Sequence, residues 1–179
     1  MEKPKDSQRK KVLSSIEQLQ TSLSSEQNAS LEGYKNVKEY VYKIVKSKWF
    51  QRNWTVENLE LKNGEPSVVK SGTTLTVSVP EQGSVSEAWV LKLFAHALSE
   101  KEDEPAHGRE FCRTYLSLVQ HFLGKEASEN LSAAYKQFGV KTRFKRVMSA
   151  EQIKALKERM MKLRPWEKAH KKAEAVASA

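Results

Sequence analysis

Residues 85–111 read VSEAWVLKLFAHALSEKEDEPAHGREF, and the rest of the sequence is organised around them. Residues 88–98 are apolar on nearly every side, which predicts a helix buried inside a domain. Lys92 and His96 interrupt this apolar run, and because they are four residues apart they share one face of the helix. Burying polar groups without partners is costly, so these two side chains are candidate functional residues.

The end of the stretch, PAHGREF, predicts the start of a second helix close to His107. This helix brings a second histidine and the carboxylate of Glu110 near the end of the buried helix. Imidazole and carboxylate groups are common zinc ligands in proteins. His96, His107 and Glu110 are therefore candidate metal ligands, with Glu100 as a further candidate.

The chain resembles a small family of zincin-type metallohydrolases of bacteria and their phages, whose central helix carries HELAHHL followed by PAHGxEF. The similarity covers roughly residues 5–142; it begins at KDSQRKKV and closes on AYKQFGV. The segment AHAL corresponds to AHHL of the family, so His96 takes the place of the second histidine of HExxH, and His107 that of the third histidine. The resemblance implies a minimal zincin-like α+β domain in which the last strand of the sheet borders the cleft.

The catalytic motif differs from the family pattern at two positions. Lys92 stands in place of the first histidine, and Leu93 stands in place of the glutamate. In HExxH the two histidines bind zinc and the glutamate acts as the base beside the metal-bound water. Leu93 cannot accept a proton, and the ammonium of Lys92 repels a nearby divalent cation. We therefore expect a catalytically degenerate protein, with no catalytic residue and no cofactor, that acts in binding or scaffolding.

Four interpretations of the site stay open at this point. His96 and His107 are structural histidines in the first, and they hold a metal in a structural role with Glu110 in the second. In the third, Lys92 occupies the space of the missing zinc and pairs with Glu110 or Glu100. In the fourth, the protein is a zinc-dependent hydrolase or peptidase with a recruited base such as Glu100, one turn beyond His96.

The composition, 39% hydrophobic and 30% charged over 179 residues, predicts one globular domain with an extension. The N-terminal residues lack the apolar segment of a signal peptide, and no stretch is apolar enough for membrane insertion. Cys112 is the only cysteine, so an internal disulfide is impossible. This favours a reducing compartment, and we expect a cytoplasmic protein.

Hydrophobic spacing predicts five helices and three strands in the first 140 residues. The helices are expected at 7–23, 36 to 50 or 54, 88–98, 107–124 and 128–138, and the strands at 59–61, 67–70 and 73–79. Ser7 is expected to cap the first helix, and residues 24–30 to form a loop. Asn63-Gly64 is expected to turn the first strand into a hairpin with the second, which gives a three-stranded antiparallel meander.

The positive charge is concentrated at the C-terminal end. Residues 141–179 carry twelve basic and four acidic side chains, a net +8 out of +9 for the whole chain. Ser149 to Gln152 fits a capping box and predicts a basic amphipathic helix that runs to Leu163. We therefore expect two parts, a zincin-like domain at 1–140 and a basic arm at 141–179, which binds nucleic acid or a protein partner. The candidate anion-binding residues of the arm are Lys141, Arg143, Lys145, Arg146, Lys154, Lys157, Arg159, Lys162, Arg164, Lys168, Lys171 and Lys172.

Overall fold

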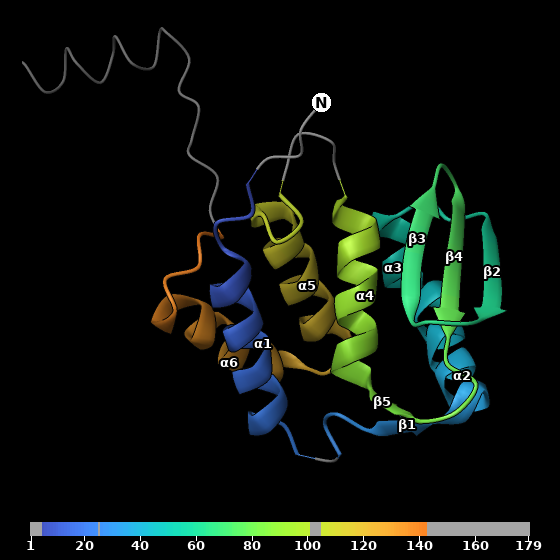
Figure 1. Ribbon diagram of the computed structural model, residues 1–179, viewed down its shortest axis with the longest axis horizontal. Helices are drawn as coiled ribbons and strands as arrows, with labels where there is room; N and C mark the ends of the chain where they lie inside the picture. The colour runs from blue at the N-terminus through green and yellow to red at the C-terminus, as the bar shows by residue number, and fades with distance from the viewer. Residues whose placement is uncertain (1–4, 25, 101–104, 143–179) are drawn as a thin grey trace, which may run out of the picture. The chain divides into compact units, whose positions relative to one another are not determined.

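A computed structural model describes residues 5–24, 26–100 and 105–142 of the chain (Figure 1). These ranges contain both helices and strands, with most strands grouped between helices, which confirms the predicted α+β class. The helices are α1 (Arg9–Ser22), α2 (Gly33–Lys46), α3 (Lys48–Asn53), α4 (Glu87–Ser99), α5 (Arg109–Phe122) and α6 (Lys125–Gln137). The strands are β1 (Ser30–Glu32), β2 (Asn58–Asn63), β3 (Ser67–Ser71), β4 (Thr74–Val79) and β5 (Ser84–Ser86). The predicted helix of the arm lies outside the described residues.

The predicted central helix is α4, which packs against α5 on one side and against β3 on the other (Figure 1). Its N-terminus is capped by Ser86, whose Oγ accepts a hydrogen bond from the backbone N–H of Trp89 at 3.2 Å. Most of the apolar residues along α4 are buried, as the sequence predicts for a helix covered on both sides. On the far side of α5, α1 packs against α6.

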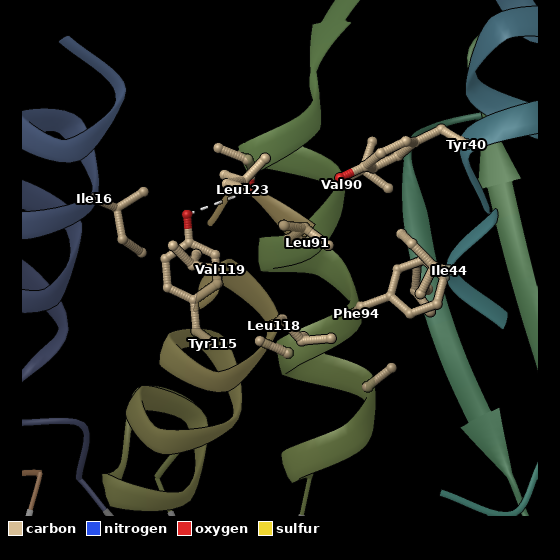
Figure 2. Close-up of a cluster of buried hydrophobic side chains, with 14 of the residues drawn as sticks. Ile16, Tyr40, Ile44, Val90, Leu91, Phe94, Tyr115, Leu118, Val119 and Leu123 are labelled. Atoms are coloured by element: carbon tan, nitrogen blue, oxygen red, sulfur yellow. Dashed lines mark hydrogen bonds between the residues drawn. The ribbon is translucent and has the colours of Figure 1, made fainter. Parts of the chain in front are cut away.

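The hydrophobic core is built on α4. Figure 2 shows Leu91 and Phe94 of α4 between Leu118 of α5 and Ile44 of α2, all of them fully buried. Tyr115 of α5 donates a hydrogen bond from its hydroxyl to the backbone carbonyl at the start of α4, 3.3 Å away. Burying each of the large apolar side chains contributes roughly 1.5–3 kcal/mol, so the position of α4 is fixed by packing.

The pairing of the main sheet differs from the predicted meander. β4 lies in the middle, parallel to β2 and antiparallel to β3. The predicted hairpin at Asn63-Gly64 is wrong, because β2 has no hydrogen bonds to β3; the tight turn joins β3 to β4 through Gly72, whose φ is +58°. In β4, Leu75, Val77 and Val79 are buried on one face, which confirms the predicted alternation. The strand with the most buried face takes the central position, where it is paired on both sides.

Three smaller expectations are also corrected. Ser7 is not the cap of α1: the helix follows Gln8, and no side chain caps it. The predicted second helix is divided at Ser47, whose extended backbone ends α2 and whose Oγ accepts the N–H of Phe50 at 3.1 Å to begin α3. β1 and β5 form a small antiparallel pair that sequence periodicity did not predict, because three residues are too few to show a period of two.

Among the helices of the described residues, none combines the length and the apolar character needed to cross a membrane.

Candidate functional site

The two histidines of the central stretch lie together. His96 is on the last turns of α4, His107 is in the loop before α5, and the centroids of their rings are 4.8 Å apart with nearly perpendicular planes. The ring of Phe111, on α5, lies 4.3 Å from that of His96 and 5.2 Å from that of His107. A backbone hydrogen bond at Ala106 also holds His96. The pair is therefore packed between α4 and the start of α5, as the sequence pattern indicates.

Asp6 completes this cluster, and sequence reasoning missed it. Its Oδ2 lies 2.6 Å from Nδ1 of His107 and accepts the backbone N–H of the same residue at 3.2 Å. The side chain of His107 is only 10% exposed and that of Asp6 21%. This contact ties the N-terminal segment to the loop before α5, and we call it the Asp6–His107 clasp. The available signal was the position of Asp6 in KDSQRKKV, the first segment of the family resemblance.

The second carboxylate oxygen of Asp6 is also inside the protein. Oδ1 is buried, and no group of the described residues donates a hydrogen bond to it. A buried carboxylate oxygen without a donor is costly. The contact of Oδ2 with His107 is therefore the interaction that holds Asp6 in place within this part of the chain.

The surroundings of His96 favour its neutral form. The pKa of His96 is lowered to about 4; burial is the largest cause, and the nearby His107 and Lys92 also lower it. Asp6 and the hydrogen bond at Ala106 act in the opposite direction and raise the pKa of His96. His96 is therefore an uncharged imidazole at neutral pH, the form that accepts hydrogen bonds and binds metal ions.

Lys92, one turn before His96 on α4, is half-buried. Burial lowers the pKa of its ammonium, the negative charge of Glu17 raises it, and the positive charge of Arg9 lowers it. Both charged residues belong to α1. The predicted pairing of Lys92 with Glu100 or Glu110 stays a prediction.

Glu110 lies apart from the histidine pair. It lines a small hollow of about 180 Å³ between α3 and α5, whose walls include Trp49, Trp54 and Arg113. Neither histidine lines this hollow. Of the three predicted metal ligands, the structure therefore groups His96 with His107 and places Glu110 at a different surface of α5.

The metal-ligand groups of the described residues can be compared with those of a catalytic zinc site. Such a site has three protein ligands and an open position for water. Within residues 5–24, 26–100 and 105–142, no three His, Cys, Asp or Glu side chains are grouped so that they could hold a metal ion. The cluster supplies two imidazoles; Nδ1 of His107 bonds Asp6, an arrangement that also orients metal-binding histidines, so this contact does not distinguish a structural from a metal-binding histidine. Leu93, at the position of the family's glutamate, packs against the core and carries no group that transfers a proton.

Of the twelve candidate anion-binding residues, Lys141 lies within the described part of the chain. Its backbone N–H donates to Oε1 of Gln8 at 2.6 Å, which joins the end of the described fold to the start of α1. The other eleven, from Arg143 to Lys172, lie outside the described residues.

Comparisons with models of protein families, with curated proteins and with solved structures find no match to this chain. The zincin-type relationship therefore rests on the motif resemblance alone.

Proposed function

We propose that the protein is a catalytically inactive, zincin-like binding or scaffolding protein, in which the helix of the degenerate motif has a structural role. The observation that supports this most directly is the Asp6–His107 clasp. In the family pattern His107 matches the third histidine; here its Nδ1 and its backbone N–H both bond Asp6, and its ring packs on His96. These contacts give both histidines a structural role, because they join the N-terminal segment, α4 and the loop before α5; it is Lys92 and Leu93 that oppose zinc chemistry itself.

The chemistry of the two altered positions supports the same proposal. Leu93 cannot serve as a general base, and the loss of such a base lowers catalysis by roughly 10²–10⁴-fold. The ammonium of Lys92 lies on the same face of α4 as His96 and lowers the pKa of that histidine, so it also opposes a divalent cation there.

The test is to restore the family motif. We expect the wild-type protein to show no chelator-sensitive peptidase activity on a quenched fluorescent casein substrate, and to retain no zinc after dialysis. The double variant Lys92→His/Leu93→Glu should bind zinc, measured by atomic emission of the dialysed protein. The matched control, Lys92→His/Leu93→Gln, should bind zinc equally well without gaining any activity, because it restores the ligand but no base.

The alternative function, a zinc-dependent hydrolase or peptidase, predicts the opposite result. Wild-type activity that a chelator abolishes and added zinc restores, and that Leu93→Glu does not raise, would show that another residue is the base. The proposal of an inactive protein would then be wrong.

A second candidate function is nucleic-acid binding through the basic arm, residues 141–179. The observation that favours it is the charge distribution, because the arm holds a net +8 and residues 1–140 hold a net +1. Lys and Arg side chains that neutralise phosphates release bound counterions, which gives salt-dependent affinity with little sequence preference. A protein partner for the same arm is the competing expectation.

A further inference from the structure

The charge of residues 1–140 is unevenly distributed. Residues 33–53, which form α2 and α3, carry six basic side chains and one acidic side chain, a net +5. The remainder of residues 1–140 carries thirteen basic and seventeen acidic side chains, a net −4. The near-neutral total therefore conceals one basic segment in an otherwise acidic part of the sequence. The basic residues of this segment are Lys35, Lys38, Lys43, Lys46, Lys48 and Arg52.

The α2 part of this basic segment combines lysines with tyrosine rings. Tyr34, Lys38, Tyr42 and Lys46 recur every four residues along α2, so they follow one another on one side of the helix, and Lys35 lies next to them. We call these five residues the α2 stripe. Lys35 and Lys46 are exposed, and the other three are half-buried. The opposite side of α2 is buried in the core through Val37, Tyr40, Val41 and Ile44.

The side chains of the stripe are arranged in contact with one another. The Nζ of Lys38 lies 5.9 Å from the ring centroid of Tyr34 and 6.0 Å from that of Tyr42, and the Nζ of Lys46 lies 5.0 Å from the ring of Tyr42. The ammonium groups of the stripe therefore lie over its half-buried tyrosine rings, so a base that stacks on one of these rings takes the place of a lysine. None of the ion pairs between described residues involves a lysine of the stripe, and the one carboxylate of α2, Glu39, lies four residues from Lys35.

We propose that the α2 stripe binds single-stranded nucleic acid. The lysines would contact phosphates, and Tyr34 and Tyr42 would present their rings to unpaired bases, which is the combination that non-specific single-strand binding uses. Twelve residues separate Tyr34 from Lys46, so the stripe is about 18 Å long and can contact a few successive nucleotides. A duplex fits less well, because its bases are already stacked on one another. This inference does not depend on whether the histidine cluster is catalytic.

The first test removes the charge of the stripe from the full-length protein. The stripe variant carries Lys35→Gln, Lys38→Gln and Lys46→Gln. The control variant carries Lys10→Gln, Lys125→Gln and Lys136→Gln, three exposed lysines of α1 and α6, which lie on the other side of the domain from α2 (Figure 1). Both variants lose three charges, and both keep the basic arm. Binding to a labelled oligothymidine is followed by fluorescence anisotropy over a range of salt concentrations.

We expect the stripe variant, compared with the control, to lose up to about 2 from the slope of log affinity against log salt, since each single-strand phosphate contributes about 0.7. Its loss of affinity for a duplex of the same length should be smaller. Equal losses in the stripe and control variants would overturn the proposal, because they would reflect net charge alone. A stripe variant that melts earlier but binds like the control would also overturn it, and would make the stripe an intrahelical stabilising feature.

The second test removes the rings and keeps the charge. Tyr34→Leu together with Tyr42→Leu should weaken oligothymidine binding by at least about fivefold without changing the salt slope, because base stacking on an aromatic side chain is lost. The corresponding double Tyr→Phe variant keeps the rings and should bind like wild type. Circular dichroism of each variant establishes that α2 is intact. Wild-type affinity in the folded Leu variant would show that the rings do not contact bases, and the proposal would fail.

Discussion

His96 is an uncharged residue in a polar cluster, and its protonation is opposed by the fold. The ordinary pKa of histidine, 6.5, applies to the unfolded chain, whereas burial and the neighbouring His107 and Lys92 lower the pKa of His96 to about 4 in the folded protein. Between these values the unfolded state binds a proton that the folded state does not. The free energy of unfolding is therefore unaffected by His96 above pH 6.5 and falls as the pH drops from 6.5 towards 4.

We expect this histidine to make the protein sensitive to mild acid. The loss of stability between pH 7 and pH 4.5 that is due to His96 should be about 2 kcal/mol, once its partial exposure is taken into account. His96→Leu removes the titrating group and should lose less stability over the same range, by that difference. Urea unfolding of both proteins at the two pH values measures this difference. Equal acid-induced losses in both proteins would contradict the prediction.

At the residue scale, the sequence predicts the contact between His96 and His107 but not the clasp. The two histidines are eleven residues apart, on a helix and on the loop that follows it, so the turn of the chain brings them together. Asp6 and His107 are 101 residues apart, and no local pattern connects them. Glu110 was expected beside the histidines because it is close in sequence; in the structure it lines a hollow together with Trp49 and Trp54.

At the scale of the elements, the break between α2 and α3 depends on Ser47. Its Oγ accepts the N–H of Phe50 at 3.1 Å and donates to the carbonyl of Ile44 at 2.8 Å, so one hydroxyl serves the end of α2 and the start of α3. Phe50 is fully buried, and its ring lies 6.0 Å from that of Phe94 in α4. The cap therefore fixes the direction in which α3 brings an aromatic ring into the core.

Loss of this cap should lower stability without affecting the rest of the helix. We expect Ser47→Ala to reduce the free energy of unfolding by about 1 kcal/mol, the usual cost of removing an N-cap hydroxyl. Ser117→Ala, in the exposed middle of α5, is the matched control and should be neutral or slightly stabilising, because alanine has the higher helix propensity. Chemical unfolding of both variants measures the difference. Equal stabilities would show that Ser47 is not the determinant of the break.

The positions of most helices follow from hydrophobic spacing, whereas the order of the strands does not. Alternation in β4 shows which face is buried, since Leu75, Val77 and Val79 must point the same way. This alternation does not indicate which strands pair with β4 on its two edges. The parallel pair of β2 and β4 joins strands that are sixteen residues apart in register, with β3 and its turn between them in the sequence. A turn signal such as Asn63-Gly64 predicts that the chain reverses direction after β2. It does not show that the next strand, β3, pairs with β4 and not with β2.

For the whole molecule, the distribution of charge along the sequence identifies two basic segments. Residues 33–53, which form α2 and α3, carry a net +5, and residues 141–179 carry a separate net +8. Two basic regions with different chemistry call for two different probes. Tyrosine rings accompany the lysines of the α2 stripe, which favours single strands, whereas the arm has twelve basic residues and Trp166 as its only aromatic residue after Phe144. A contribution from the arm should therefore be measured on duplex DNA, where stacking on protein rings contributes least.

If the arm binds nucleic acid, about four to six of its twelve basic residues reach phosphates, and the affinity for duplex DNA should change with salt with a slope of about −4 to −5. A chain that ends at Thr142 keeps the hydrogen bond between Lys141 and Gln8 and loses the eleven basic residues beyond it. We expect this shorter chain to lose most of the salt-dependent duplex affinity, while its circular dichroism still shows the helices and strands of residues 5–142.

The stripe variant, which retains the arm, is the control and should keep most of its duplex affinity. Because base edges are not read by lysine contacts to phosphate, duplexes of different sequence should bind alike. Duplex binding of the shorter chain equal to that of the whole protein, or the absence of salt-sensitive binding by the whole protein, would instead assign the arm to a protein partner.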